Sequence, residues 1–84
     1  MKMENKVVRM MNTYKTSDLY LSAFLKARGM RLTDKQRNGH KFIFIFDDRG
    51  DRKALIQEFF NDGTVSITAF KNAIQDLKTM VFNT

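Results

Sequence analysis

The sequence predicts a small α+β domain, in which an antiparallel β-hairpin packs with three helices in the order α-β-β-α-α. Two observations carry this prediction. Asn38 and Gly39 separate two extended segments, and an Asn-Gly pair in that position is a strong short-range signal for a hairpin. Apolar residues recur at helical spacing on both sides of the hairpin. The chain has 84 residues, which is the size of one domain.

The chain divides into a short extension and a folded part. Its opening residues are polar and rich in Met, and a second Met-Asn-Thr begins at Met11 as a candidate alternative start. We therefore expect residues 1–13 to form a flexible N-terminal extension and residues 14–84 to form a single α+β domain.

The first helix is expected in the segment KTSDLYLSAFLKARG. Thr16 or Ser17 is suited to cap its start, and Asp18 is favourable in the first turn. Gly29 provides the left-handed C-terminal stop. Apolar residues cover most of the helix circumference, so we expect this helix to be largely buried.

The hairpin is expected to pair residues 30–36 with residues 41–47. A two-residue Asn38-Gly39 loop places Lys35 opposite Phe42 and Arg31 opposite Phe46. Met30, Leu32, Ile43 and Ile45 then share a core face, while the three Phe residues of HKFIFIF share the other face with the basic residues. A change of one residue in the loop reverses this pairing. Three interpretations of the Phe face stay open: a core roofed by a helix, a stacking platform, or a dimer interface.

Two more helices follow the hairpin. Asp48 or Asp51 is expected to cap a helix through RKALIQEFFN, which Gly63 ends. Ser66 is expected to cap the last helix. The apolar stripe of that helix is Ile67, Phe70, Ile74, Leu77 and Val81, and its wet side is Lys71, Asn72, Gln75 and Lys78.

Composition excludes several classes of protein. The chain has no Cys, so disulfides, thiolate metal sites and cysteine nucleophiles are absent. No apolar run approaches the roughly 20 residues of a membrane span, and the N-terminus lacks the apolar region of a signal peptide. We expect a cytoplasmic protein that does not contact a membrane.

No motif indicates an enzyme. Asp47, Asp48 and Asp51 are of a type that binds magnesium, but turn formation and helix capping explain them more simply. His40 lies beside a turn glycine with no evident partner, and no glycine-rich phosphate loop is present. We predict a non-enzymatic domain with no catalytic residue, no metal and no cofactor.

The positive charge is concentrated near the hairpin. Residues 26–41 hold six basic residues and one acid, whereas the whole chain has a net charge of +6. Cations interleaved with aromatic rings on a sheet are typical of single-stranded nucleic-acid binders. The predicted nucleic-acid-binding residues are Arg28, Arg31, Lys35, Arg37, Lys41, Phe42 and Phe44.

We therefore expect nucleic-acid binding through the basic hairpin. The alternative is a protein-interaction module or inhibitor, such as an accessory protein of a mobile element, that docks on an acidic or nucleic-acid-binding partner. A homodimer formed through an exposed half of the sheet is a third hypothesis. The last two helices also allow a helix-turn-helix interpretation, in which Lys71 and Gln75 would face a DNA groove.

Three segments, YKTSDLYLSAFLKARGMRL, KFIFIFDD and FFNDGTVSITAFKNAIQDLK, are similar to a family of small uncharacterised domains from bacterial, archaeal and phage-related genomes. The resemblance covers most of residues 14–82. It implies a shared fold but no activity, and it implies that Tyr14, Asp18, Tyr20, Phe24 and Phe70 belong to the pattern of the family.

Overall fold

A computed structural model describes residues 12–82. The elements are β1 (Thr13–Thr16), α2 (Leu19–Ala27), β2 (Leu32–Asn38), β3 (Lys41–Asp47), α3 (Arg52–Phe60) and α4 (Ile67–Phe82). The three strands form an antiparallel sheet in the order β1-β3-β2. The α+β class, the hairpin and the three helices are confirmed, whereas β1 was not predicted.

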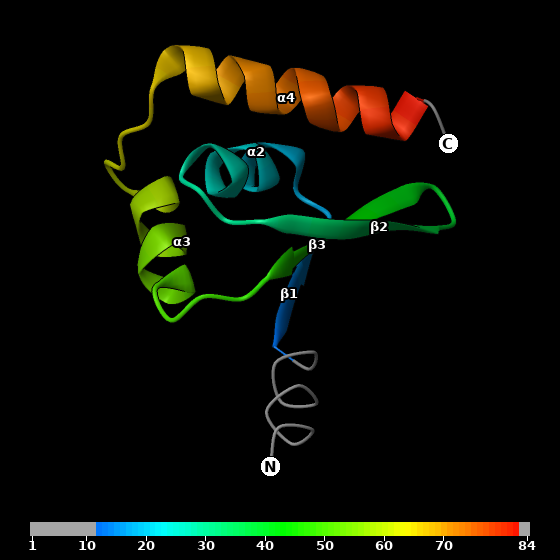
Figure 1. Ribbon diagram of the computed structural model, residues 1–84, viewed down its shortest axis with the longest axis horizontal. Helices are drawn as coiled ribbons and strands as arrows, with labels where there is room; N and C mark the ends of the chain where they lie inside the picture. The colour runs from blue at the N-terminus through cyan, green and yellow to red at the C-terminus, as the bar shows by residue number, and fades with distance from the viewer. Residues whose placement is uncertain (1–11, 83–84) are drawn as a thin grey trace.

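The layers follow from which elements cover the sheet. Figure 1 shows α2 between the sheet and α4, with α3 across the end of the sheet that lies away from the hairpin turn. Of the 1–13 extension, residues 1–11 lie outside the described residues, and Thr13 belongs to β1. The backbone N–H of Asp48 donates to the carbonyl oxygen of Asn12 over 3.0 Å, which continues the β1–β3 pairing by one step.

Helix α2 forms where the sequence predicted, but its N-cap is Asp18 and not Thr16 or Ser17, and Thr16 instead ends β1. The Asp18 carboxylate accepts a hydrogen bond from the backbone N–H of Leu21 over 3.0 Å. At the other end, Gly29 takes φ +100°, and the N–H groups of Gly29 and Met30 donate to the carbonyls of Lys26 and Leu25. This is a Schellman motif, and it needs a residue that tolerates positive φ. Met30 is 2% exposed and so ties the end of the helix to the core.

The predicted hairpin register is wrong, because the loop is Gly39-His40 and not Asn38-Gly39. Asn38 pairs with Lys41, Arg37 with Phe42 and Lys35 with Phe44. Gly39 has φ +67°, and no described residue other than glycine has positive φ. A single positive φ at the first loop position is typical of a type II′ turn, whereas an Asn38-Gly39 type I′ turn would need positive φ at both residues.

A β-bulge between Leu32 and Asp34 then changes which residues share a face. Beyond the bulge Leu32 pairs with Phe46. Leu32 therefore joins the Phe face, and the prediction that it shares a face with Ile43 and Ile45 is wrong. The extra residue, Thr33, donates its hydroxyl to the carbonyl oxygen of Ile45 over 3.1 Å. The Phe face is therefore the core face of the sheet.

The core lies between this face and the helices. Phe44 and Phe46 are 2% and 0% exposed, which confirms the interpretation of these two rings as core. They pack with residues from every helix, including Phe24, Leu55 and Leu77. Ile45 is also buried, but it lies outside this main cluster.

The last two helices differ from the prediction at their ends. Ser66 caps α4 as expected, through a 3.2 Å hydrogen bond from the N–H of Ala69. Asp51 is the N-cap of α3, but its carboxylate makes no capping bond: its ψ of 10° is outside the extended region typical of capping residues, and Arg49 binds both carboxylate oxygens. Ile67 is 83% exposed and not part of the apolar stripe, because it starts α4 outside the contact with α2.

The helix-turn-helix interpretation is not supported by this arrangement. Residues 61–66 join α3 to α4 and are longer than the turn of three or four residues in that motif. Helix α4 packs along α2, and α3 packs against α2 from the end of the sheet. The wet side of α4, which includes Lys71 and Gln75, is exposed as predicted.

Candidate nucleic-acid interface

The residues that the sequence marked for nucleic-acid binding are divided between two ends of the sheet. Arg28 and Arg31 precede β2, whereas Lys35, Arg37, Lys41 and Phe42 lie in the hairpin. Arg31 lies about 20 Å from Arg37 along an extended strand, so Arg28 and Arg31 do not form one patch with the turn of the hairpin. The candidate interface is the outer hairpin, which we define as residues 35–42.

Arg28 belongs to the packing of the fold. Its guanidinium donates to the Glu58 carboxylate over 2.6 Å and to the carbonyl oxygen of Thr64 over 3.1 Å, and it lies 5.4 Å from the centre of the Phe24 ring. The hydrogen bond to Glu58 raises the pKa of Arg28 above its usual value. Arg28 thus joins α2 to α3 and to the loop before α4, and its charge is already neutralised.

Three other cations outside the outer hairpin are neutralised in the same way. Lys26 pairs with Asp76 over 3.6 Å, which links α2 to α4. Arg49 binds Asp51, and this hydrogen-bonded pair lowers the pKa of the Asp51 carboxyl. Arg52 binds Asp48, which raises the pKa of Arg52, and its guanidinium lies 4.7 Å from the centre of the Tyr14 ring.

The cations of the outer hairpin remain available. Within residues 12–82, no ion pair involves Lys35, Arg37 or Lys41. Arg37 donates through Nε to the carbonyl oxygen of Gly39 over 3.2 Å, and its guanidinium lies 5.5 Å from the centre of the Phe42 ring. The register places Lys35 and Arg37 on the Phe face and Lys41 on the opposite face, so the positive charge surrounds the turn.

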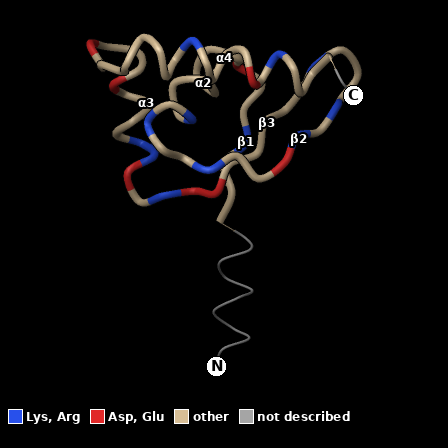
Figure 2. The backbone as a smooth tube through the Cα atoms, turned by 45° about the horizontal axis from the view of Figure 1, so that its top comes forward, with Lys and Arg blue, Asp and Glu red and all other residues tan. Residues whose placement is uncertain are grey.

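The acidic residues are unevenly distributed over the molecule. In Figure 2, Lys and Arg follow one another along the hairpin beyond Asp34, while most Asp and Glu residues lie around α3 at the other end. These acids are Asp47, Asp48, Asp51, Glu58 and Asp62. The outer hairpin carries four basic side chains, counting His40, and no acid. The acids at the other end lie among basic residues that pair with three of them, so the local excess of positive charge that attracts a polyanion lies at the outer hairpin.

The two predicted stacking rings differ in access. Phe44 is 2% exposed under the helices, so its ring cannot receive a base in this conformation. Phe42 is half-buried, and it lines an open cleft between the outer hairpin and the last turn of α4. Only Phe42 of the pair is placed to contact a ligand.

This cleft was not predicted from the sequence. Its volume is about 390 Å³, and it is lined by Ser17, Leu19, His40, Lys41, Phe42, Phe44, Lys78, Val81 and Phe82. A helix of sixteen residues is about 24 Å long and one of nine residues about 13 Å, so α4 has to extend past α2. The length difference was the signal in the sequence that α4 reaches over the hairpin.

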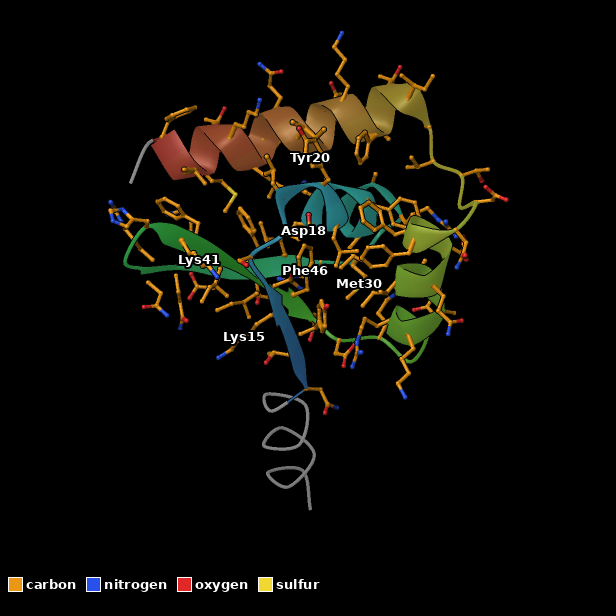
Figure 3. The ribbon with its side chains drawn as sticks, turned by 180° about the vertical axis from the view of Figure 1, so that it is seen from behind. Lys15, Asp18, Tyr20, Met30, Lys41 and Phe46 are labelled. Atoms are coloured by element: carbon orange, nitrogen blue, oxygen red, sulfur yellow. The ribbon has the colours of Figure 1, made fainter. Side chains whose placement is uncertain are left out.

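The opposite face of the sheet is not covered by α2 or α4. The register places Lys15, Ile43 and Lys41 on it. In Figure 3, Lys15 points away from the helices, and Lys41 lies on the hairpin below the end of α4. Lys15 adds a fourth unpaired cation within the described residues close to the outer hairpin.

No metal or membrane site emerges from the described part of the chain. Residues 12–82 contain no group of three or more His, Asp or Glu side chains arranged to hold a metal ion. Asp48 and Asp51, which the sequence made metal candidates, are instead bound by arginines. Within the same residues, no helix has both the length and the apolar character needed to cross a bilayer.

Comparison with known proteins places the chain in a family. No curated protein and no solved structure matches it. Residues 11–83 match a family described as Domain of unknown function (DUF5659). This match covers nearly all of the folded part and agrees with the resemblance of the sequence to an uncharacterised family. The chain belongs to the DUF5659 family.

Proposed function

We propose that this domain binds nucleic acid through the outer hairpin. The observation that carries the proposal is the set of unpaired cations in the outer hairpin, which contains no acid. Outside the outer hairpin, four cations of the described residues have carboxylate partners, namely Lys26, Arg28, Arg49 and Arg52. The outer hairpin differs from the other unpaired cations because it brings three of them and His40 together within eight residues that include no acid, which provides a local site for phosphates.

The hairpin also has the mechanical properties that such a site needs. Arg37 is held by the carbonyl oxygen of Gly39 and by the ring of Phe42, so part of its side-chain freedom is lost before a ligand arrives. Phe42 is in turn fixed by its half-buried position beside the core. Lys41 extends on the other face, which lets a phosphate backbone cross the turn with contacts on both sides.

A salt titration tests this function. Fluorescence anisotropy with labelled single-stranded and double-stranded oligonucleotides should show binding that weakens as salt increases, because bound cations release counterions from the nucleic acid. The double variant Arg37→Gln with Lys41→Gln should reduce the slope of log affinity against log salt by about 2, one for each lost phosphate contact.

The matched control neutralises two exposed cations elsewhere. Lys53 in α3 and Lys71 in α4 are exposed and have no ion pair within residues 12–82. The double variant Lys53→Gln with Lys71→Gln has the same net charge as the test variant, and it should keep the slope of the unmodified protein. Equal slopes for both variants, or no salt-sensitive binding at micromolar protein, would overturn the proposal.

A further inference from the structure

The cleft between the outer hairpin and the end of α4 keeps apolar side chains accessible. Phe82 is 83% exposed although it lines the cleft, and Leu19, Phe42 and Val81 are partly buried around it. Phe44 and Leu77 lie beneath these side chains and are themselves buried, at 2% and 0% exposure. The exposed apolar surface of the cleft is therefore additional to the buried core. The cleft is therefore an accessible apolar surface beside the proposed phosphate site.

The lining of the cleft combines two kinds of chemistry. Phe42 and Phe82 supply aromatic rings, and Leu19 and Val81 complete the apolar wall. His40, Lys41 and Lys78 supply the basic groups, and none of the described residues that line the cleft is acidic. A ligand that fits this lining has a flat apolar part and negative charge on either side of it.

An unpaired nucleotide within a strand has this chemistry. Its base stacks on aromatic rings whatever its identity, and phosphates flank it on both sides. The volume of about 390 Å³ lies within the range of roughly 300 to 1,000 Å³ that is usual for small-ligand sites, and one nucleotide fits it. A base in a duplex is stacked and paired, so its faces cannot reach such a cleft without being flipped out.

We propose that the cleft receives one unpaired base and that Lys41 and Lys78 bind the phosphates beside it, which makes the domain selective for single-stranded nucleic acid. This inference rests on the proposed function, since Lys41 belongs to both sites. In this proposal the end of α4 forms one wall of the binding site and the outer hairpin forms the other. Selectivity comes from the rings of the cleft, and affinity comes from the cations of the hairpin.

Removing one exposed ring tests the inference. The probe is a short single strand with a fluorescent base analogue at its centre, because the emission of the analogue changes when it stacks. Phe82→Ala should weaken binding of this strand by roughly tenfold and abolish the emission change, since base–aromatic stacking contributes strongly to such complexes. Binding of a duplex and the salt slope should stay the same, because no charge is removed.

Phe60→Ala is the matched control, because Phe60 is 67% exposed in α3 at the other end of the molecule. It should bind both probes as the unmodified protein does. Because Phe82 is exposed, the variant is expected to fold, and the unchanged duplex binding verifies this.

The outcomes separate the two proposals. Salt-sensitive binding that is equal for single strands and duplexes, with no effect of Phe82→Ala, overturns the base-binding cleft and leaves the proposed function standing. Binding to an otherwise identical strand with an abasic centre as tight as to the intact strand also overturns the cleft. Absence of binding to every oligonucleotide overturns both.

Discussion

At the scale of single residues, Gly63 shows why a glycine is needed in a loop without positive φ. Its N–H donates to the carbonyl oxygen of Glu58 over 2.7 Å. A Cβ atom at this position would lie 2.6 Å from that oxygen and 2.7 Å from the Cβ atom of Glu58. Glu58 also binds Arg28, so Gly63 lies at the junction of α2, α3 and the loop to α4.

Replacing Gly63 with Ala should therefore destabilise the fold. The added methyl group has to displace backbone atoms of α3, and overpacking of this kind costs about 1 to 3 kcal/mol. Gly50→Ala is the control, because nothing lies within 4 Å of a Cβ atom at Gly50. Urea unfolding measures both variants. A free energy of unfolding for Gly63→Ala that equals that of Gly50→Ala contradicts the close approach.

Sequence reasoning located Gly63 as the end of a helix but could not supply this cause. A glycine at the end of a helix is usually explained by positive φ, which holds for Gly29 and not for Gly63. The contact that excludes a side chain arises only when the loop folds back on α3. Local sequence patterns predict where such a glycine lies, but the close contact that requires a glycine is formed by tertiary packing.

At the scale of elements, the two aspartates at helix starts differ in a way that composition does not show. Asp18 caps α2 through its carboxylate, whereas Asp51 occupies the same position in α3 with its carboxylate held by Arg49. Both were expected near helix starts from the residue type alone. The backbone also differs, since ψ is 113° at Asp18 and 10° at Asp51, and residue type alone does not show this difference.

This difference gives a paired prediction for the caps. Asp18→Ala should lower the free energy of unfolding by about 1 kcal/mol, because it leaves the N–H of Leu21 without a partner. Asp51→Ala removes an exposed ion pair and no capping bond, so its effect should be smaller than that of Asp18→Ala. Thermal unfolding followed by circular dichroism ranks the two variants. The reverse order of stability is the contradicting result.

Helices were easier to predict than strands in this chain. Apolar residues that recur at helical spacing over four turns predicted α4, and the sequence also predicted Ser66 as its cap. Strand β1 has only four residues, TYKT, which show no run of apolar residues. Its position depends on Tyr14, whose ring contacts Arg52 and which pairs with Phe46 far along the chain. Such pairing has no local signal.

At the scale of the whole molecule, α4 has two roles along one helix. Leu77 is 0% exposed in the core, and one turn later Val81 and Phe82 form a wall of the cleft. The cleft therefore depends on the packing of α4 onto the rest of the domain. Sequence reasoning found the apolar stripe of α4 but could not place its far end, because that depends on where α2 stops.

Truncating Leu77 should show how firmly α4 is attached. Leu77→Ala should lower the free energy of unfolding by about 2 to 5 kcal/mol, as is usual for a fully buried leucine. Ile67→Ala, in the same helix and 83% exposed, should leave stability almost unchanged. Chemical denaturation of the two variants gives the comparison. Similar midpoints for both would show that α4 is not anchored through Leu77.

The candidate site was predicted in part. The sequence identified Lys35, Arg37, Lys41 and Phe42, which the structure brings together in the outer hairpin. It also included Arg28, because charge counts along a chain do not reveal that Glu58, thirty residues away, neutralises that charge. It omitted Lys78 and Phe82 for the same reason, since their proximity to the hairpin is tertiary.

The order of the strands also bears on how the chain reaches its fold. The central strand, β3, joins β2 through a turn, and Asn38 and Lys41 pair across it. On its other edge, Thr13 pairs with Asp47, which lies 34 positions later in the sequence. Closing the longer loop between β1 and β3 costs more chain entropy. The β1–β3 pairing contributes little stabilisation until β3 and the helix between the two strands have formed. The strand without a local signal is thus the one whose formation waits for the rest of the domain.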